Sequence, residues 1–360
     1  MSLAIRLASV PARSSRDCRR HWAGFPCVNC GCWPQACAVI SMPDLARDGS
    51  RIECPRSAEL EARLGKAGKN NAVPTLWVTA FVHLAMGRLW SWQLGPGTPA
   101  EQIHLFRLLN TLSAEAPIVC DAAYMGFDLV RAIVGSSRSF LFCMSSKVHL
   151  YTLEKATLKT WSEGPVLYWP QCAQADGQAP IHCRLIRIPA KGKTKRDVWL
   201  LADVLDPARL SLASAAKFYR WRWRSKDMFR TYKRTIDKLK LLSRTAQLVH
   251  REAESSLLAT QILLAQADLA LRPETSASGE SVISPRKVLI EIRREMEATA
   301  KRRGQSPGKR LEGCRADDRK QTRPKASRPW PRRKSHKPPV IHTLSEEQNV
   351  LLNQHFDAAG

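Results

Sequence analysis

An alternation of strand-like and helix-like apolar segments is the feature that most restricts how this chain can fold. Residues 75–94 (TLWVTAFVHLAMGRLWSWQL) predict two strands, rich in β-branched and aromatic residues, that are joined by a turn at Gly87-Arg88. The breaker GPGTP follows, and apolar side chains then recur with helical spacing in residues 100–112. The first part of the chain is therefore expected to be of the mixed α/β type.

The segments that follow repeat the alternation. Residues 116–124 (APIVCDAAY) predict a short buried strand that ends in an acid, DLVRAIV is helical, and residues 139–145 (SFLFCMS) predict another strand. The order strand-strand-strand-helix-strand-helix-strand, then an insertion and a long helix, matches a ribonuclease H-like core with a mixed sheet. In such a core, acids at adjacent strand ends and on a late helix can bind two divalent ions.

The rest of the chain divides by composition. Strand-like runs separated by turn-rich pieces form a β-rich insertion, and a proline-free helical part completes the core that began at residues 46–146. A linker, then a short helix with a basic and disordered tail, follow. The predicted boundaries are 147–210 for the insertion, 211–272 for the helical end of the core, 273–285 for the linker and 286–360 for the helix and tail.

The charge of the chain predicts a polyanionic partner. It carries 57 Lys and Arg against 32 Asp and Glu, a net charge of +25. Residues 301–339 alone hold 15 basic and 3 acidic residues. No apolar run approaches the roughly 20 residues that a membrane span needs, so a nucleic acid is favoured over a membrane.

The cysteines favour a reducing, cytoplasmic compartment, because eleven are scattered over a long chain. Five of them lie in residues 1–45, an atypical leader without convincing periodicity. Cys27 and Cys30 have a spacing that can hold zinc, but a second well-spaced pair is missing, so a disordered or non-native leader stays the favoured alternative.

Two acids are candidates for a divalent-ion site. Asp121 ends the buried run PIVC, where a carboxylate projects into the cleft at the strand end. Asp48 is placed at a glycine turn between strand-like pieces, with Asp44 as a rival four residues earlier. Any such acid can instead be a turn or capping residue, so both interpretations remain open.

The motifs DGSR, CDAAYMGFDLVRAI and YRWRWRSKDMFRTYKR resemble those of DDE-type transposases from bacterial insertion sequences, in the branch with a β-rich insertion. The resemblance covers residues 46–270. It implies that Asp48 and Asp121 hold Mg²⁺ or Mn²⁺, with Ala123 in place of the usual glycine. It also implies a nucleoid-associated bacterial protein that binds insertion-element ends, as a possible homodimer. The helical DNA-recognition region expected before the first aspartate is missing, which suggests an N-terminal truncation.

The family's third motif is Y-x2-R-x3-E-x6-K, which places Tyr219, Arg222, position 226 and Lys233 within roughly 60° on one helix face. The resemblance implies an aromatic ring for a base and two cations for phosphates. Trp223 and Arg230 are further candidates for DNA contact, although a solvated basic face explains the arginine equally well.

Position 226 is Lys where the family has glutamate. An ammonium between two aspartates neutralises them and repels a divalent ion, and Asp227 lies about 100° away around the helix. We therefore expect a DNA transposase whose metal-dependent strand cleavage and transfer are impaired by Lys226. A non-catalytic DNA-binding remnant, and a protein that binds nucleic acid through its basic tail, are the alternatives.

Overall fold

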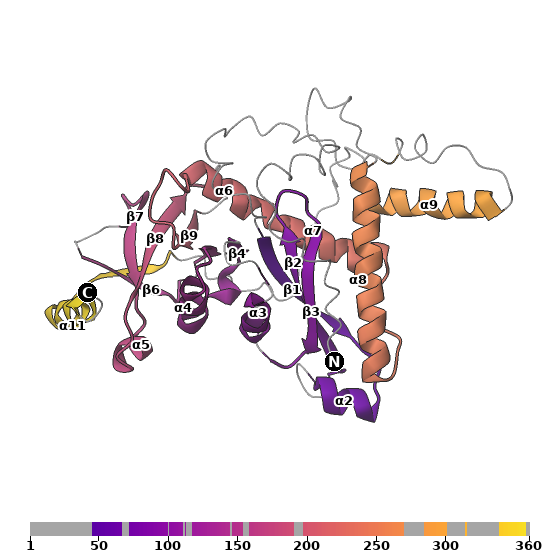
Figure 1. The fold of residues 1–360 in the computed structure, drawn as a ribbon, viewed down its shortest axis with the longest axis horizontal. Coiled ribbons are helices and arrows are strands. Elements are labelled where there is room, and N and C mark those ends of the chain that lie inside the picture. Colours follow the sequence, from indigo (N-terminus) through magenta and orange to yellow (C-terminus); the bar gives the residue numbers. More distant parts are fainter. Residues whose placement is uncertain are drawn as a thin grey trace, which may run out of the picture.

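The computed structural model describes most of the chain from residue 45 onward (Figure 1). The described residues are 45–66, 72–99, 101–110, 112, 117–144, 146–153, 158–190, 197–269, 284–300, 314 and 338–357. The predicted leader, except for Leu45, and most of the basic segment 301–339 lie outside them. No helix among the described residues is long and apolar enough to cross a membrane.

Five strands in the first part of the chain form the core of the sheet, in the order β3-β2-β1-β4-β5. The first three pair antiparallel, whereas β1, β4 and β5 run parallel to one another. This arrangement confirms the predicted α/β, ribonuclease H-like fold class. The strands are β1 (Leu45–Glu53), β2 (Thr75–His83), β3 (Leu89–Pro96), β4 (Ile118–Cys120) and β5 (Phe140–Cys143).

Helices cover both faces of this sheet, because the buried strands carry apolar side chains on both faces. Leu45, Ile118 and Phe140 pack in one cluster with α3 (Glu101–Leu109) and α4 (Phe127–Gly135). Their chain neighbours Ala46, Val119 and Leu141 face the other side and pack with α6 (Leu212–Trp221). The small helix α2 (Ala58–Leu64) joins β1 to β2.

The β-rich segment after β5 extends the same sheet instead of standing apart from it. Strand β9 pairs antiparallel with β5, and the order continues as β9-β8-β7-β6. A short helix, α5 (Gln171–Ala175), lies between β7 and β8. The strands are β6 (His149–Thr152), β7 (Glu163–Tyr168), β8 (Ile181–Ile188) and β9 (Val198–Ala202).

The end of the chain differs from the prediction of a disordered tail through residue 360. Strand β10 (Val340–Thr343) pairs parallel with β6 and completes a ten-stranded sheet among the described residues. Helix α11 (Glu346–Asp357) follows, and the side chains of Leu344 and Leu352 are buried in the main core cluster. Apolar contacts to the insertion therefore order a segment whose neighbouring composition suggested disorder.

The helical part predicted for residues 211–272 is interrupted, which corrects the expectation of unbroken helix. Helix α6 bends at Arg222 into α7 (Trp223–Arg230), a π-helical turn spans Thr231–Thr235, and residues 236–245 leave the helix. Helix α8 (Ala246–Leu269) then crosses beside the sheet, and α9 (Pro285–Ala300) packs against it (Figure 1). Most of the predicted linker, residues 273–285, lies outside the described residues, and its last residue, Pro285, is the first residue of α9.

Candidate functional site

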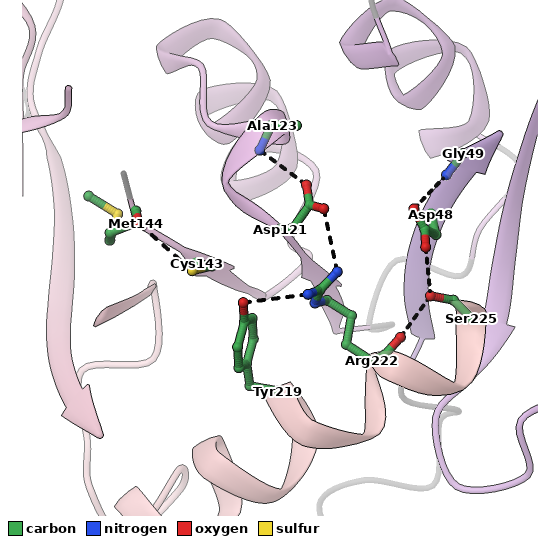
Figure 2. Close-up of polar contacts among 9 residues, drawn as sticks. All are labelled: Asp48, Gly49, Asp121, Ala123, Cys143, Met144, Tyr219, Arg222 and Ser225. Atoms are coloured by element: carbon green, nitrogen blue, oxygen red, sulfur yellow. Dashed lines mark hydrogen bonds and ion pairs between the residues drawn. The ribbon is translucent and has the colours of Figure 1, made fainter. Parts of the chain in front are cut away.

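Asp48 and Asp121 come together because their strands are parallel neighbours. Leu45 pairs with Ile118 and Ala46 with Val119, so the same register continued by two residues puts Asp48 beside Asp121. Side chains alternate between the two faces of a strand, so Asp48 lies on the same face as Ala46, and Asp121 on the same face as Val119. Ala46 and Val119 face α6. The two carboxylates therefore point to the side of the sheet where α6 and α7 cross it (Figure 2).

Asp48 lies inside strand β1, so its predicted place in a glycine turn was wrong. Residues on both sides of it pair with β2, and this pairing holds the sequence Asp48-Gly49-Ser50 in extended form. The Gly49 N–H donates to Oδ1 of Asp48 at 3.0 Å, and the Ser225 hydroxyl lies 3.2 Å from Oδ2. Burial raises the pKa of Asp48, although the Lys226 charge acts in the opposite direction.

Asp121 follows β4 directly, as predicted, and has the capping role that was one of the two interpretations left open for it. Its Oδ1 accepts the Ala123 N–H at 3.1 Å and so caps the short 3₁₀ helix at Ala122–Tyr124. Its Oδ2 lies 3.5 Å from Nη1 of Arg222 (Figure 2). The acid is thus a capping residue and also the partner of a cation on the crossing helix.

Arg222 stands at the bend between α6 and α7, and only 3% of it is exposed. Its Nη2 lies 3.5 Å from the Tyr219 hydroxyl, and its guanidinium carbon is 5.0 Å from the centre of the Tyr219 ring. Burial raises the pKa of Tyr219, so this phenol stays protonated. Arg222 is therefore directed at Asp121 and Tyr219, and the predicted contact with a phosphate requires its side chain to become accessible.

Lys226 lies on α7, and of all neighbouring charges its ammonium has the largest effect on the pKa of Asp48, which it lowers. Its Nζ is 4.6 Å from the centre of the Trp223 ring. Asp227, the weak substitute for the missing acid, instead pairs with Arg230 at 2.9 Å on an exposed face of the helix. The structure therefore brings Lys226, and not Asp227, to the acid pair.

Lys233 lies in the π-helical turn, and its side chain also reaches the sheet. Its Nζ donates to the Arg51 carbonyl on β1 at 3.3 Å. Burial lowers the pKa of Lys233, while Asp48 and Glu53 act to raise it. Trp223 is 55% exposed and its ring lies beside Lys226, whereas Arg230 pairs with Asp227 on the exposed face of the helix.

Sequence reasoning missed two neighbours of the acids, Ser225 and Cys143. Ser225 is fully buried and also donates to the Arg222 carbonyl at 2.7 Å, so it fixes the bend of the helix against Asp48. The β4–β5 register, continued by one residue from Cys120 and Phe142, places Cys143 beside Asp121. Burial raises the pKa of this thiol. The position of Ser225, a small polar residue inside the helix motif, could have indicated a contact with the acids. The position of Cys143 beside Asp121 follows only from the strand register.

These residues do not fit a pair of divalent ions. Magnesium and manganese prefer several anionic or carbonyl oxygens, whereas Arg222 and Lys226 bring two cations to two carboxylates. Among the described residues, no three His, Cys, Asp or Glu side chains are grouped so that they can hold a metal ion. The site is an acid pair bound by the protein's own cations.

The strand order and pairing define a ribonuclease H-like α/β fold. No family model matches the sequence, and no curated protein matches it. A solved structure with some similarity is the piggyBac transposase in a synaptic complex with hairpin DNA, with a TM-score of 0.41 and 10% sequence identity. The similarity covers 77% of this chain and 58% of that one, so this chain matches little more than half the length of the piggyBac transposase.

Proposed function

We propose that this protein is a DNA-binding transposase of the DDE type whose metal-dependent strand cleavage and transfer are impaired. The observation that carries the proposal is the position of Asp48 and Asp121 on neighbouring strands of a ribonuclease H-like sheet, under the bend of α6–α7. Acids in that position are suited to phosphoryl transfer when they hold divalent ions. The residue at the third acid position is Lys226, which removes that capacity.

DNA binding is supported by the net charge and by the side chains around the acid pair. Lys226 and Lys233 are half-buried at the edge of the site, and Trp223 and Arg230 are exposed beside them on the same helical segment. An aromatic ring with cations close to it suits the bases and phosphates of a nucleic acid. We propose insertion-element ends as the DNA and Tyr219 and Arg222 as supports of this surface.

A cleavage assay tests the catalytic part of the proposal. Purified protein is incubated with duplexes that carry insertion-element ends, in Mg²⁺ or Mn²⁺, and nicked and joined products are measured. We expect no turnover above the Asp121→Asn variant. Robust, divalent-dependent turnover by the unaltered protein would show that Lys226 does not impair the site.

Fluorescence anisotropy with a labelled duplex tests the binding part. Lys233→Ala is expected to weaken binding several-fold and to reduce the slope of log K against log salt by about 1. Arg63→Gln removes an equal charge from α2, far from α7, and serves as the control (Figure 1). Unaltered affinity and slope in Lys233→Ala would refute its role in holding DNA.

The basic segment 301–339 supports the alternative that nucleic-acid binding resides there. Because β10 begins at Val340, replacing the Lys and Arg residues of 301–337 by Ser or Gln is preferable to deletion. If that variant loses all binding while Lys233→Ala binds normally, the protein is a nucleic-acid binder through this segment.

A further inference from the structure

Each of the four carboxylate oxygens of the acid pair lies within 3.5 Å of a polar group of the chain itself. Asp48 receives the Gly49 N–H and lies beside the Ser225 hydroxyl. Asp121 receives the Ala123 N–H, and its other oxygen lies 3.5 Å from the Arg222 guanidinium. A divalent ion would have to share these oxygens with the polar groups already beside them.

Cations that belong to the chain also balance the charge of the pair. Arg222 contacts Asp121 from the buried side, and Lys226 directly follows Ser225, whose hydroxyl lies 3.2 Å from Oδ2 of Asp48. Lys233 reaches β1 three residues further along, since its Nζ donates to the Arg51 carbonyl. Arg222 and Lys226 thus bring two positive charges to two carboxylates, where metal ions would otherwise supply them, and Lys233 adds a third charge further along β1.

Lys226 and Lys233 are the accessible part of this set. Both are half-buried, whereas Arg222 is buried, and the Trp223 ring lies under the Lys226 ammonium at 4.6 Å. The aromatic contact restricts the lysine without neutralising it. Ammonium groups held in this way attract a phosphate as point charges.

We propose that Arg222 and Lys226 replace divalent ions at the acid pair, and that Lys226 and Lys233 receive a DNA phosphodiester there without metal. The second half rests on the proposed DNA binding, whereas the first half concerns the folded protein alone. Each half has its own experiment, so that failure of one is distinguishable from failure of the other.

Thermal denaturation tests the first half without DNA. The unaltered protein is expected to show the same Tm in EDTA and in 5 to 10 mM Mg²⁺ or Mn²⁺, on the order of concentrations that saturate weak oxygen sites. Lys226→Glu, which places three acids together, is expected to lose stability in EDTA and to gain several degrees with Mn²⁺. Lys226→Gln is the control for loss of the lysine alone. A Tm rise with Mn²⁺ in the unaltered protein, or none in Lys226→Glu, would overturn this half.

Anisotropy with a labelled duplex tests the second half. Binding by the unaltered protein is expected to be equal in EDTA and in Mg²⁺. Lys226→Gln should weaken it about 5- to 10-fold and lower the salt slope by about 1, as loss of one phosphate contact does. Lys226→Arg keeps the charge and should retain most of the affinity, and Arg63→Gln should change neither quantity.

The outcomes separate the proposals. If the unaltered protein binds no DNA, the proposed function fails, while the Tm experiment still decides the first half. If it binds DNA but Lys226→Gln matches Arg63→Gln in affinity and salt slope, the proposed phosphate contact of Lys226 is refuted, while DNA binding itself is supported. DNA binding that requires Mg²⁺ also refutes the proposal that Lys226 and Lys233 bind the phosphodiester without metal.

Discussion

At the scale of single residues, the sequence predicted which residues lie together better than it predicted their local geometry. Asp121 and the spacing of Tyr219, Arg222 and Lys226 could be identified from motifs and helical periodicity. The in-strand position of Asp48 could not, because Asp, Gly and Ser are poor strand formers and only pairing with β2 holds them extended. The contacts of Ser225 and Cys143 depend on strand register and on the helix bend, neither of which a single sequence specifies.

Arg222 leads to a prediction about stability. Arg222→Met removes the cation from a nearly buried pair and leaves Asp121 without its partner, which should lower the free energy of unfolding by about 2 kcal/mol. Urea denaturation at pH 7 measures it. Arg230→Met breaks an exposed pair on the same helix and should cost less than about 0.5 kcal/mol.

Combining Arg222→Met with Asp121→Asn removes both charges, so the double variant should lose less stability than the sum of the single losses. Simple additivity of the two variants would mean that Arg222 and Asp121 do not interact in solution.

At the scale of elements, β2 to β5 and the helices α3 and α4 were predictable, because each carries a clear apolar period, whereas β1 and α2 were not predicted. The break at residues 236–245 was not predicted either, since no proline or glycine marks it. Tertiary contacts stabilise this break in the helix. The Leu241 N–H donates to the Glu53 carbonyl of β1. Glu252 on α8 accepts hydrogen bonds from Lys238 and from the N–H groups of Leu242 and Ser243.

Glu252 therefore gives a pH-dependent prediction. Burial would raise the pKa of Glu252, but the Lys238 and backbone hydrogen bonds prevail and lower it from 4.5 to about 2. Because the folded-state pKa is depressed, the stabilisation is fully present above about pH 4.5 and is lost as the pH falls toward 2. Glu252→Gln should thus cost about 2 kcal/mol at pH 7 and progressively less below pH 4.5.

Denaturation of Glu252→Gln and of the unaltered protein at a series of pH values measures this difference. Glu254→Gln, an exposed change on the same helix, is the control and should follow the unaltered protein at every pH. A difference that stays constant between pH 7 and pH 3 would show that the carboxylate charge of Glu252 does not hold the loop.

At the scale of the whole molecule, one sheet runs through the ribonuclease H-like part, the insertion and the end of the chain. Composition indicated separate parts, because the segment before Val340 is basic and rich in proline. Pairing across long sequence separations overrides that local signal: β9 joins β5, and β10 closes the edge at β6. Such pairings leave no mark in a local window of sequence, since they depend on buried apolar partners elsewhere in the chain.

The last prediction concerns that C-terminal edge. Truncation after residue 337 removes β10 and α11, exposes the edge of β6 and uncovers the core positions that Leu344 and Leu352 fill. We expect a Tm lower by several degrees and increased light scattering on heating, because an open strand edge promotes aggregation. His149→Ala removes only the exposed contact of 2.8 Å between the rings of His149 and His342, and should cost about 1 kcal/mol or less. If the truncated protein melts and scatters like the full chain, the C-terminal strand does not pair with β6 in solution.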